Sequence, residues 1–574
     1  MHDLVIRGGT VVDGTGAPPR TADVAVDDGL VTEVGNVKEG GSRTIDADGL
    51  LVTPGWVDVH THYDGQATWD DVLAPSAWHG VTTIVMGNCG VGFAPARPDR
   101  RQWLIGLMEG VEDIPGTALS EGIEWEWETF PQYLEALDRR RWTMDVGTQV
   151  PHGAVRAYVM GERGARNEEA TPEEIAEMKA IVKEAVAAGA LGFSTSRTTA
   201  HRAIDGEPVP GTFAAENELF GIGAALGELG TGVFELAPAG SAGEDVDDPK
   251  KEMDWMRRLS AHVGRPVTFA MLQVDPYPDL WADLLAESLA ATAEGADVWP
   301  QVAGRPTGLL SGHQTSYSLL DQIPAYVELK ARRLPPAALA RELGDPEVRR
   351  RIVTWQPPDD ATAEAMAKAY HHTYLLGSPP DYEPDRERSL AAVAARTGQT
   401  PLEVAYDAMM EGGGSGLLYV PILNYSSGSL DPTRTMLLHP RAALGLGDGG
   451  AHVGIICDAS TPTYMLTHWA RDRSRGPGLP IELVVQKQTR DTARLYGMTD
   501  RGTLEPGMLA DCNLVDFERL QLGDPWVSAD LPAGGARLLQ DADGYVATIK
   551  RGVTTFQEGR DTGARPGHLV RGTS

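Results

Sequence analysis

The sequence predicts an α/β protein in which a (β/α)8 TIM barrel is joined to a small β-sandwich-like domain built from both termini. Three observations predict this arrangement. Through the middle of the 574-residue chain, short apolar runs alternate with helical segments, and the strands of a parallel barrel are apolar because they are buried on both faces. Both ends of the chain are instead rich in β-branched residues and glycine turns. The two ends resemble each other more than either resembles the middle.

The small domain is expected to contain residues 1–52 and 503–574. Its N-terminal part includes a hairpin predicted around Asp28-Gly29, a dipeptide that suits the tight turn between two strands. The predicted strand regions lie at 4–14, 22–35, 510–516 and 544–553. Two β-rich ends that flank a different middle suggest a single domain formed by both.

The barrel is expected to occupy residues 53–502. Its clearest helix follows Thr171-Pro172-Glu173-Glu174, where a capping threonine, a first-turn proline and a capping-box glutamate come in the right order. The predicted strands, in order, lie at 56–62, 81–86, 145–150, 190–195, 232–236, 266–272, 296–302 and 444–448. Counting the first and the last of these as neighbours closes a ring of eight.

Two segments are too long to be ordinary barrel connections. Residues 97–143 form one expected insertion. Residues 306–440 form another, partly helical, which we expect to lie over the barrel mouth as a lid. The tail after Asp561 is rich in Gly, Pro and Arg, and we expect it to be loosely packed.

Composition excludes several classes of protein. The formal net charge of −31 opposes binding to nucleic acids and to anionic membranes, and an anionic substrate would need a local cationic patch. No apolar run reaches the roughly 18 residues of a membrane span, and the segment Met1–Arg7 does not have the pattern of a signal peptide. Three cysteines in so long a chain make no disulfide framework. A soluble cytoplasmic protein is expected, and a homo-oligomer is compatible with the sequence.

The residues with the clearest chemistry are His60 and His62, at the end of the first predicted strand. Residues two apart on a strand share a face, so both imidazoles can bind one divalent ion, zinc most readily. Asp448 ends the eighth predicted strand, and strand C-termini form the active site of a barrel. Asp448 could bind the same ion, or move a proton as acid and base. The alternatives are two chance histidines and an aspartate that serves only the turn before Gly449-Gly450.

These motifs give the chain a resemblance to the amidohydrolase superfamily, and within it to the D-aminoacylase (N-acyl-D-amino-acid deacylase) family. The segments that resemble the family are Leu4–Gly16, Pro54–His62, Gly80–Gly90 and Arg501–Asp511. They span both ends and the barrel. The resemblance implies a metal-dependent hydrolase that cleaves the amide of N-acylated D-amino acids, with a barrel and a β-sandwich-like domain.

Carried over residue by residue, the resemblance implies a metal site of His60, His62 and Asp448, with Asp448 also the catalytic acid and base. It also matches Cys89 to the cysteine ligand of the family, and thiolate suits zinc. The alternative for Cys89 is a small buried apolar residue.

The chain departs from the family pattern at strands five and six, where histidines for a second metal position are expected. Neither 232–238 nor 267–273 contains a histidine. Glu235 could replace one as an oxygen ligand, and Gln273 could at most form a hydrogen bond. We therefore expect one zinc ion rather than two, completed by Cys89 or Glu235.

Candidate substrate-binding residues follow the predicted strands. They are His152, Arg197, His201, Arg305 and His452. An N-acyl amino acid carries a carboxylate, and either Arg197 or Arg305 could grip it. The alternative for each arginine is an ion pair with a structural acid. His371 and His372, in a helical part of the second insertion, are expected at the surface.

Three functions remain open on the sequence. The first is a metal-dependent amidohydrolase that cleaves N-acyl-D-amino acids or related linear amides through metal-activated water. The second keeps this mechanism but acts on a cyclic amide, an imide or another acylated small molecule, since one barrel hosts many chemistries. The third is a non-catalytic barrel that acts as a binding module. The expected partner is a small molecule that carries a carboxylate.

Overall fold

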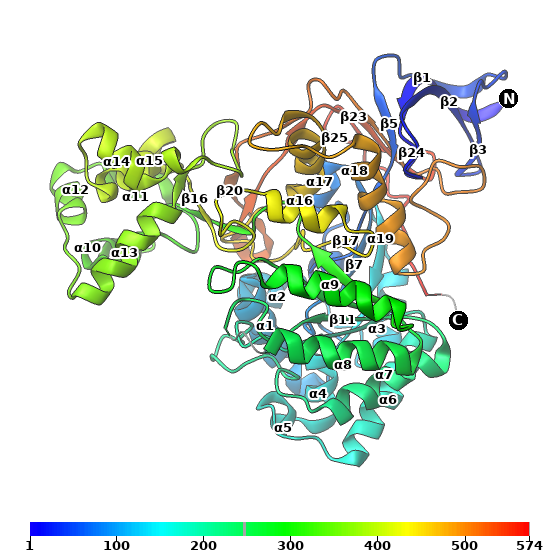
Figure 1. Cartoon of the computed structure of the whole chain (residues 1–574), viewed down its shortest axis with the longest axis horizontal. Helices are drawn as coiled ribbons and strands as arrows, with labels where there is room; N and C mark the ends of the chain where they lie inside the picture. Colours follow the sequence, from blue (N-terminus) through cyan, green and yellow to red (C-terminus); the bar gives the residue numbers. More distant parts are fainter. Residues whose placement is uncertain (245–247, 573–574) are drawn as a thin grey trace.

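A computed structural model of the chain describes residues 1–244 and 248–572, and it confirms the (β/α)8 barrel (Figure 1). The strands around the barrel are β6 (Trp56–Asp58), β7 (Val81–Met86), β8 (Asp145–Thr148) continued by β9 (Val150–Pro151), β10 (Gly192–Ser196), β11 (Val233–Ala237), β12 (Val267–Ala270), β13 (Val298–Val302) and β17 (Ala443–Leu444). Neighbours pair in parallel. The ring closes where Thr61 pairs with Gly449, so the ends of the first and eighth strands are in direct contact.

Helices cover the outside of the barrel because each presents one apolar stripe to the strands. The longer ones are α6 (Pro172–Ala187), α7 (Glu216–Leu229), α8 (Asp248–Val263) and α9 (Leu280–Ala293), with α18 (Ile481–Gln488) and α19 (Arg490–Leu495) after the eighth strand. The predicted start of α6 is present as a capping box: Thr171 accepts from the Glu174 amide, and the Glu174 side chain accepts from the Thr171 amide. Buried stripe residues such as Met178 and Val182 join the barrel core.

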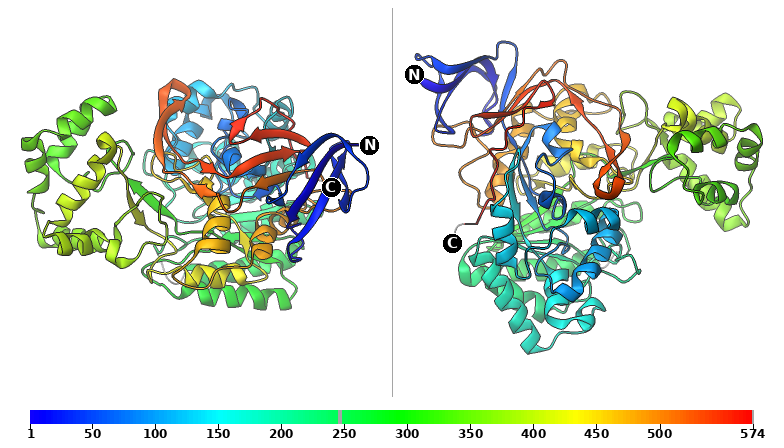
Figure 2. Two further views of the ribbon diagram at one scale, coloured as in Figure 1. Left: turned by 90° about the horizontal axis from the view of Figure 1, so that it is seen from above. Right: turned by 180° about the vertical axis from the view of Figure 1, so that it is seen from behind.

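The small domain is built around one sheet that contains strands from both ends of the chain. From the N-terminus come β1 (His2–Val11), β2 (Arg20–Asp27), β3 (Leu30–Gly35), β4 (Gly41–Asp46) and β5 (Leu51–Pro54), and from the C-terminus β18 (Cys512–Val515), β23 (Tyr545–Lys550), β24 (Val553–Gln557) and β25 (Arg560–Asp561). The two ends join where β5 pairs antiparallel with β18. Figure 2 shows these blue and red strands side by side above the barrel.

The expectation of a loosely packed tail is wrong. Leu569 pairs with Val146 of β8, and the Val146 amide donates to the His568 carbonyl at 3.0 Å. Further on, the Gly572 amide donates to the Gly189 carbonyl at 3.0 Å. The third strand pairs with the fourth through β9 and β10. The backbone at the N-terminal end of β8 therefore has one edge left to pair with the tail. Unsatisfied backbone groups favour such pairing over a disordered tail.

The two insertions differ in how they relate to the barrel. The first carries α1 (Arg101–Glu112), α2 (Gly116–Gly122) and α3 (Phe130–Asp138), whose buried residues belong to the barrel core. The second contains a small sheet of β14 (Gly308–Ser311), β15 (Tyr374–Leu375) and β16 (Leu418–Pro421), and the helices α10 (Pro324–Lys330), α11 (Pro336–Leu343), α12 (Pro346–Val353), α13 (Asp360–His372), α14 (Leu390–Thr397) and α15 (Pro401–Gly414).

The helices of the second insertion do not form the expected lid over the barrel mouth. They pack around their own apolar core and project to one side of the molecule (Figures 1 and 2). A separate core lets this region fold against itself, so it does not need the barrel to bury its apolar faces. Among residues 1–244 and 248–572, no helix combines the length and apolar character needed to cross a membrane.

Candidate metal centre and cavity

His60 and His62 lie just beyond β6, at the C-terminal end of the first strand. The backbone there is held by the eighth strand: the Asp448 amide donates to the His60 carbonyl at 3.1 Å, and the His62 amide donates to the Gly449 carbonyl at 2.8 Å. Both imidazoles are buried. The closure of the barrel therefore brings the two histidines and Asp448 to one place, although almost four hundred residues separate them in sequence.

The side chains of these residues converge. Asp448 Oδ1 lies 3.4 Å from His60 Nε2 and 3.9 Å from His62 Nε2. Cys89 Sγ lies 3.4 Å from His60 Nε2. One donor atom each of His60, His62 and Cys89 lies within 4.8 Å of the other two. The structure thus brings together the residues that the sequence placed at a first metal position, with the cysteine beside them.

The other ring nitrogens of the histidines face groups that fix their orientation. His60 Nδ1 lies 2.8 Å from Oε1 of Gln301 on β13, and donates to it when the proton is on Nδ1. His62 Nδ1 lies 3.2 Å from Oε1 of Glu112, although the pair is not aligned as a full hydrogen bond. An acceptor beside Nδ1 favours a proton on that nitrogen and leaves the Nε2 lone pair for a metal.

Glu112 and Gln301 are site residues that sequence reasoning missed. Glu112 ends α1 in the first insertion and is buried, and it also approaches His452, with 3.6 Å between Oε2 and Nε2. No sequence signal could have found Glu112, because nothing in the insertion shows where its last turn lies. Gln301 did carry a signal, since an amide inside the apolar run of strand seven needs a buried partner.

Glu235 supports the site from behind Cys89. Its Oε2 accepts from the Cys89 amide at 3.0 Å, and its Oε1 lies 3.9 Å from His60 Nδ1, the nitrogen that faces Gln301. Glu235 also does not line the cavity next to the site. In this geometry Glu235 orients Cys89, so the structure favours the cysteine over Glu235 as the ligand that completes the histidine pair.

The chain is strained around the site. Cys89 has a φ of 54° and Asp448 a φ of 46°, both in the left-handed region that non-glycine residues rarely adopt. His452 follows with a φ of 48°. Such strain costs about 1–3 kcal/mol per residue and is often found where a side chain must be aimed for function.

Burial sets the protonation of the site. Burial lowers the pKa of His60 to about 4 and that of His62 well below its usual value, so both are neutral and able to bind a metal near pH 7. Burial raises the pKa of the Asp448 carboxyl to about 8, with further contributions from Asp458 and Asp58. Burial also raises the pKa of the Cys89 thiol, so a metal bound there would displace a proton.

A cavity of about 200 Å³ opens beside these residues. Its polar lining includes His201 and His452, as the sequence predicted for substrate contact. His201 Nδ1 lies 3.0 Å from the Ser196 hydroxyl. The complete lining is His60, His62, Cys89, Glu112, Thr198, His201, Ala237, Ser241, Ala242, Ala270, Leu272, Thr307, Leu309, Ile422, Leu423, Leu446, Asp448, His452, Ile455 and Ile456. From the second insertion, only residues within 307–309 and 422–423 take part in this lining. We call these two segments, which connect the insertion to the barrel, its stem.

The structure does not bring the other three predicted substrate-binding residues to the cavity, and this corrects those assignments. Arg305 is buried against Asp458, 2.7 Å away, and stacks 3.9 Å from the ring centre of Tyr382. Arg197 pairs with Glu252 at 2.8 Å. His152 uses both ring nitrogens, facing Thr195 at 2.8 Å and Glu218 at 2.9 Å. All three are committed to buried contacts, so none is free for a substrate.

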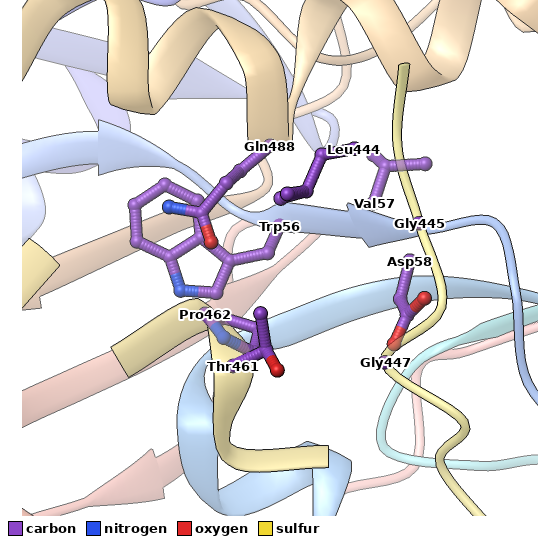
Figure 3. A pocket seen from close by; sticks show the side chains of 9 residues that line it. All are labelled: Trp56, Val57, Asp58, Leu444, Gly445, Gly447, Thr461, Pro462 and Gln488. Atoms are coloured by element: carbon purple, nitrogen blue, oxygen red, sulfur yellow. The ribbon is translucent and has the colours of Figure 1, made fainter. Parts of the chain in front are cut away.

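A second, much smaller pocket lies between the first strand, the eighth strand and the helical residues Thr461, Pro462 and Gln488 (Figure 3). Its volume of about 20 Å³ suits a single water molecule. Burial raises the pKa of Asp58 to about 7, and its Oδ1 accepts from the His60 amide at 3.1 Å. This pocket is too small for a substrate, and Asp58 serves to hold the backbone of His60.

The donor set fits a zinc ion. Zinc binds imidazole nitrogen at about 2.0 Å and thiolate sulfur at about 2.3 Å in tetrahedral geometry, which separates two donors by roughly 3.3–3.6 Å. The separations of 3.4 Å from His60 Nε2 to Cys89 Sγ and to Asp448 Oδ1 match this spacing, whereas His62 Nε2 lies 3.9 Å from Asp448 Oδ1. Among the described residues, the donor atoms that all lie within 4.8 Å of one another belong to His60, His62 and Cys89, so these three fit as ligands and Asp448 lies beside them. Nitrogen, sulfur and carboxylate ligands together favour zinc over magnesium or calcium.

The barrel, with two histidines after its first strand and an aspartate after its eighth, defines a protein of the amidohydrolase class. The chain belongs to the Amidohydrolase family, which it matches over residues 43–556. This confirms the family predicted from sequence motifs and makes the chain a hydrolase of carbon–nitrogen bonds other than peptide bonds.

Individual relatives agree with this assignment. A D-aminoacylase of Alcaligenes xylosoxydans xylosoxydans is 27% identical over 580 residues, which cover 100% of this chain and 98% of that protein. A crystal structure of a D-aminoacylase superposes with a TM-score of 0.65 at 23% identity over 100% of both chains. The N-acyl-D-glutamate deacylase of Bordetella bronchiseptica, complexed with zinc and a phosphonate inhibitor, gives 0.64 at 22% identity over 99% of both chains. At these identities the two structures establish a shared fold.

Proposed function

We propose that this chain hydrolyses the amide bond of N-acyl-D-amino acids or related linear amides, with a zinc ion held by His60, His62 and Cys89 and with Asp448 beside it. The observation that carries the proposal is the convergence of these side chains beside a cavity at the C-terminal end of the barrel. The full-length similarity to a D-aminoacylase supports the choice of reaction. A divalent ion held there would polarise the amide carbonyl and lower the pKa of a water molecule to about 7.

Asp448 is the residue proposed to move the proton. In the overall reaction the oxygen of water bonds to the acyl carbon, the carbon–nitrogen bond breaks, and the nitrogen gains a proton. The Asp448 carboxylate takes a proton from the attacking water and passes it to the leaving amine. A divalent ion held beside Asp448 would stabilise its carboxylate form, so that the group can accept the proton and then release it to the leaving amine.

The remaining residues hold the site in place. Gln301 and Glu112 fix the two histidine rings, and Glu235 fixes the Cys89 backbone. His201 and His452 line the cavity as neutral imidazoles, because burial lowers the pKa of each to about 4. We assign these two histidines to hydrogen bonding with the polar atoms of the substrate amide.

The test combines metal analysis with a hydrolysis screen. Purified full-length protein should contain about one zinc per chain, and should release free amine from at least one member of a panel of N-acyl-D-amino acids, N-acyl-L-amino acids, linear amides and cyclic imides. His60→Ala should lose both the metal and the activity. His371→Ala is the matched control, because His371 is exposed on α13, and it should keep both.

Other outcomes identify the alternatives. Cleavage of cyclic imides alone would favour the cyclic-amide hydrolase. Protein without zinc, and without hydrolysis after zinc is added, would contradict the proposal and favour a non-catalytic binding module. Zinc bound with no cleavage of any substrate would contradict the proposed reaction but not the proposed metal centre.

A further inference from the structure

We infer that the cavity selects amides whose unreacting part is uncharged and apolar, in preference to N-acyl amino acids bound through a free carboxylate. The inference rests on the proposed function, because it concerns the substrate of the same site. It is carried by the charges and the apolar wall around the cavity.

No lysine or arginine lines the cavity among residues 1–244 and 248–572. The five residues outside these ranges are Asp245, Val246, Asp247, Thr573 and Ser574, and none of them is a lysine or arginine. Arg197 and Arg305 are the two arginines that the sequence suggested for binding a substrate carboxylate. Each is paired with an acid instead, Arg197 with Glu252 and Arg305 with Asp458. A substrate carboxylate would therefore meet no cationic side chain of the kind that normally binds one.

The ionisable groups that surround the cavity are instead acidic or neutral. Asp448 and Glu112 line it, and Glu235 lies behind Cys89. A divalent ion held by His60, His62 and Cys89 would have its two positive charges balanced by the Cys89 thiolate and the adjacent Asp448 carboxylate. The glutamates add no positive charge in either protonation state. The site therefore offers an anionic substrate no net attraction, even with the metal in place.

A further carboxylate, Glu244, lies directly behind two residues of the cavity lining. Glu244 accepts hydrogen bonds from the Thr198 hydroxyl and from the Ala242 amide, the latter at 3.0 Å. Both Thr198 and Ala242 line the cavity. An anion entering at this side would approach a carboxylate that is fixed in place, which slows its association and weakens its binding.

Most of the remaining lining is an apolar wall built from three parts of the chain. Leu272 follows β12, Leu309, Ile422 and Leu423 come from the stem of the second insertion, and Ile455 and Ile456 follow the eighth strand. Ile422 is 42% exposed, which extends the apolar surface to the mouth. Moving a carboxylate from water to such a wall without a partner is costly, whereas burying an aliphatic group there is favourable by about 25 cal/mol per Å².

The first experiment compares two substrates that differ only in the charge of one group. Full-length zinc-loaded protein is given N-acetyl-D-leucinamide or N-acetyl-D-leucine, and acetate release is followed. The amide should have a kcat/KM at least about tenfold higher, with the difference mainly in KM. N-acetyl-D-aspartate, with two carboxylates, should be the poorest of the three. Equal or faster cleavage of N-acetyl-D-leucine would overturn the inference.

A pair of variants tests whether charge at the cavity decides this preference. Ile422→Arg places a cation on the cavity wall, and should move the acid-to-amide ratio of kcat/KM about tenfold toward the acid at low salt, with a smaller shift at high salt. Leu438→Arg is the matched control, because Leu438 is also 42% exposed but does not line the cavity. It should leave the ratio unchanged. An unchanged ratio in folded Ile422→Arg would overturn the inference.

The outcomes separate the two proposals. If both substrates are cleaved and the acid is preferred, the inference on charge fails and the proposed hydrolase stands. If neither these substrates nor the wider panel is cleaved by zinc-loaded protein, the proposed function fails, and with it the inference.

Discussion

Two clusters of buried carboxylates lie at opposite ends of the barrel strands and have opposite surroundings. Asp145, at the start of β8, contacts Arg501 at 2.7 Å, Lys550 at 2.8 Å and Arg551 at 3.3 Å, and accepts from the His568 amide at 2.8 Å. At the other end, Asp448, Glu112 and Glu235 have no lysine or arginine contact among the described residues.

The difference separates a structural cluster from a functional one. Burial alone would raise the pKa of Asp145, but Lys550, Arg501 and Arg551 outweigh it and hold that pKa well below its usual value. At the cavity, burial prevails and raises the pKa of both Asp448 and Glu235 to about 8. An ionised Asp145 therefore stabilises the fold, whereas ionising the cavity carboxyls costs stability unless a cation binds there. Groups maintained at such a cost are characteristic of a site that must bind or react.

The largest expected effect is on activity. Asp448→Asn should lower kcat/KM by about 10²–10⁴-fold, because the amide cannot move the proton. In zinc-free protein the free energy of unfolding should remain unchanged or increase, because a buried carboxyl without a cation is removed. Substrate kinetics and urea denaturation measure the two quantities. Glu364→Gln, at an exposed acid on α13, is the control and should change neither. Near-normal kcat/KM for Asp448→Asn would contradict its catalytic role.

The second prediction concerns the opposite cluster. Asp145→Ala should lower the free energy of unfolding by about 3 kcal/mol, because it leaves Arg501 and Lys550 buried with one acid fewer. Activity of the protein that remains folded should be nearly normal. Asp138→Ala, at an exposed acid whose nearest cation is 3.5 Å away, should change stability by less than about 0.5 kcal/mol. A similar loss of stability in both variants would contradict the claim that the buried ion pairs of Asp145 stabilise the fold.

The third prediction concerns Glu112, which lies beside the candidate zinc ligand His62. Unlike Asp145, Glu112 has no lysine or arginine partner among the described residues. Glu112→Gln should weaken zinc binding by about 10–100-fold, because a neutral amide oxygen accepts from His62 Nδ1 more weakly than a carboxylate and leaves the imidazole a weaker ligand. Competition with a chromophoric chelator measures the affinity directly. Glu109→Gln on the same helix keeps an acceptor for the Gly116 amide and should bind zinc as the wild type does. Unchanged zinc affinity in Glu112→Gln would remove Glu112 from the site.

The smallest effect is a pH dependence at Glu383, another buried carboxylate that has cationic partners. Burial would raise the pKa of Glu383, but hydrogen bonds from His468 and Arg473 outweigh it and lower the pKa to about 2. A group with a depressed folded-state pKa stabilises fully above its ordinary value of 4.5, and this contribution is lost as the pH falls toward 2. Glu383→Gln should therefore lose less stability than the wild type between pH 4.5 and 3. Parallel losses in both proteins would contradict the assignment.

Much of the fold could be predicted because it is encoded in local patterns. The apolar runs marked the barrel strands, Thr171 and Glu174 marked the start of α6, and the periodicity of two placed His60 and His62 on one face. Family motifs added Asp448 and Cys89. Arg305 was a candidate for binding the substrate carboxylate because it follows a barrel strand. The local sequence cannot show that its guanidinium forms a buried ion pair with Asp458.

The sequence by itself therefore determined the barrel and the two-ended sheet and named the candidate donor groups, because each depends on periodicity, turn residues and chemical type. Only the tertiary structure decided that Glu112, from an insertion, stands beside His62, that the tail lies along β8, and that Arg197 and Arg305 are paired with acids. These contacts join residues far apart in the chain, and long-range pairing leaves no periodic trace in the residues that make it.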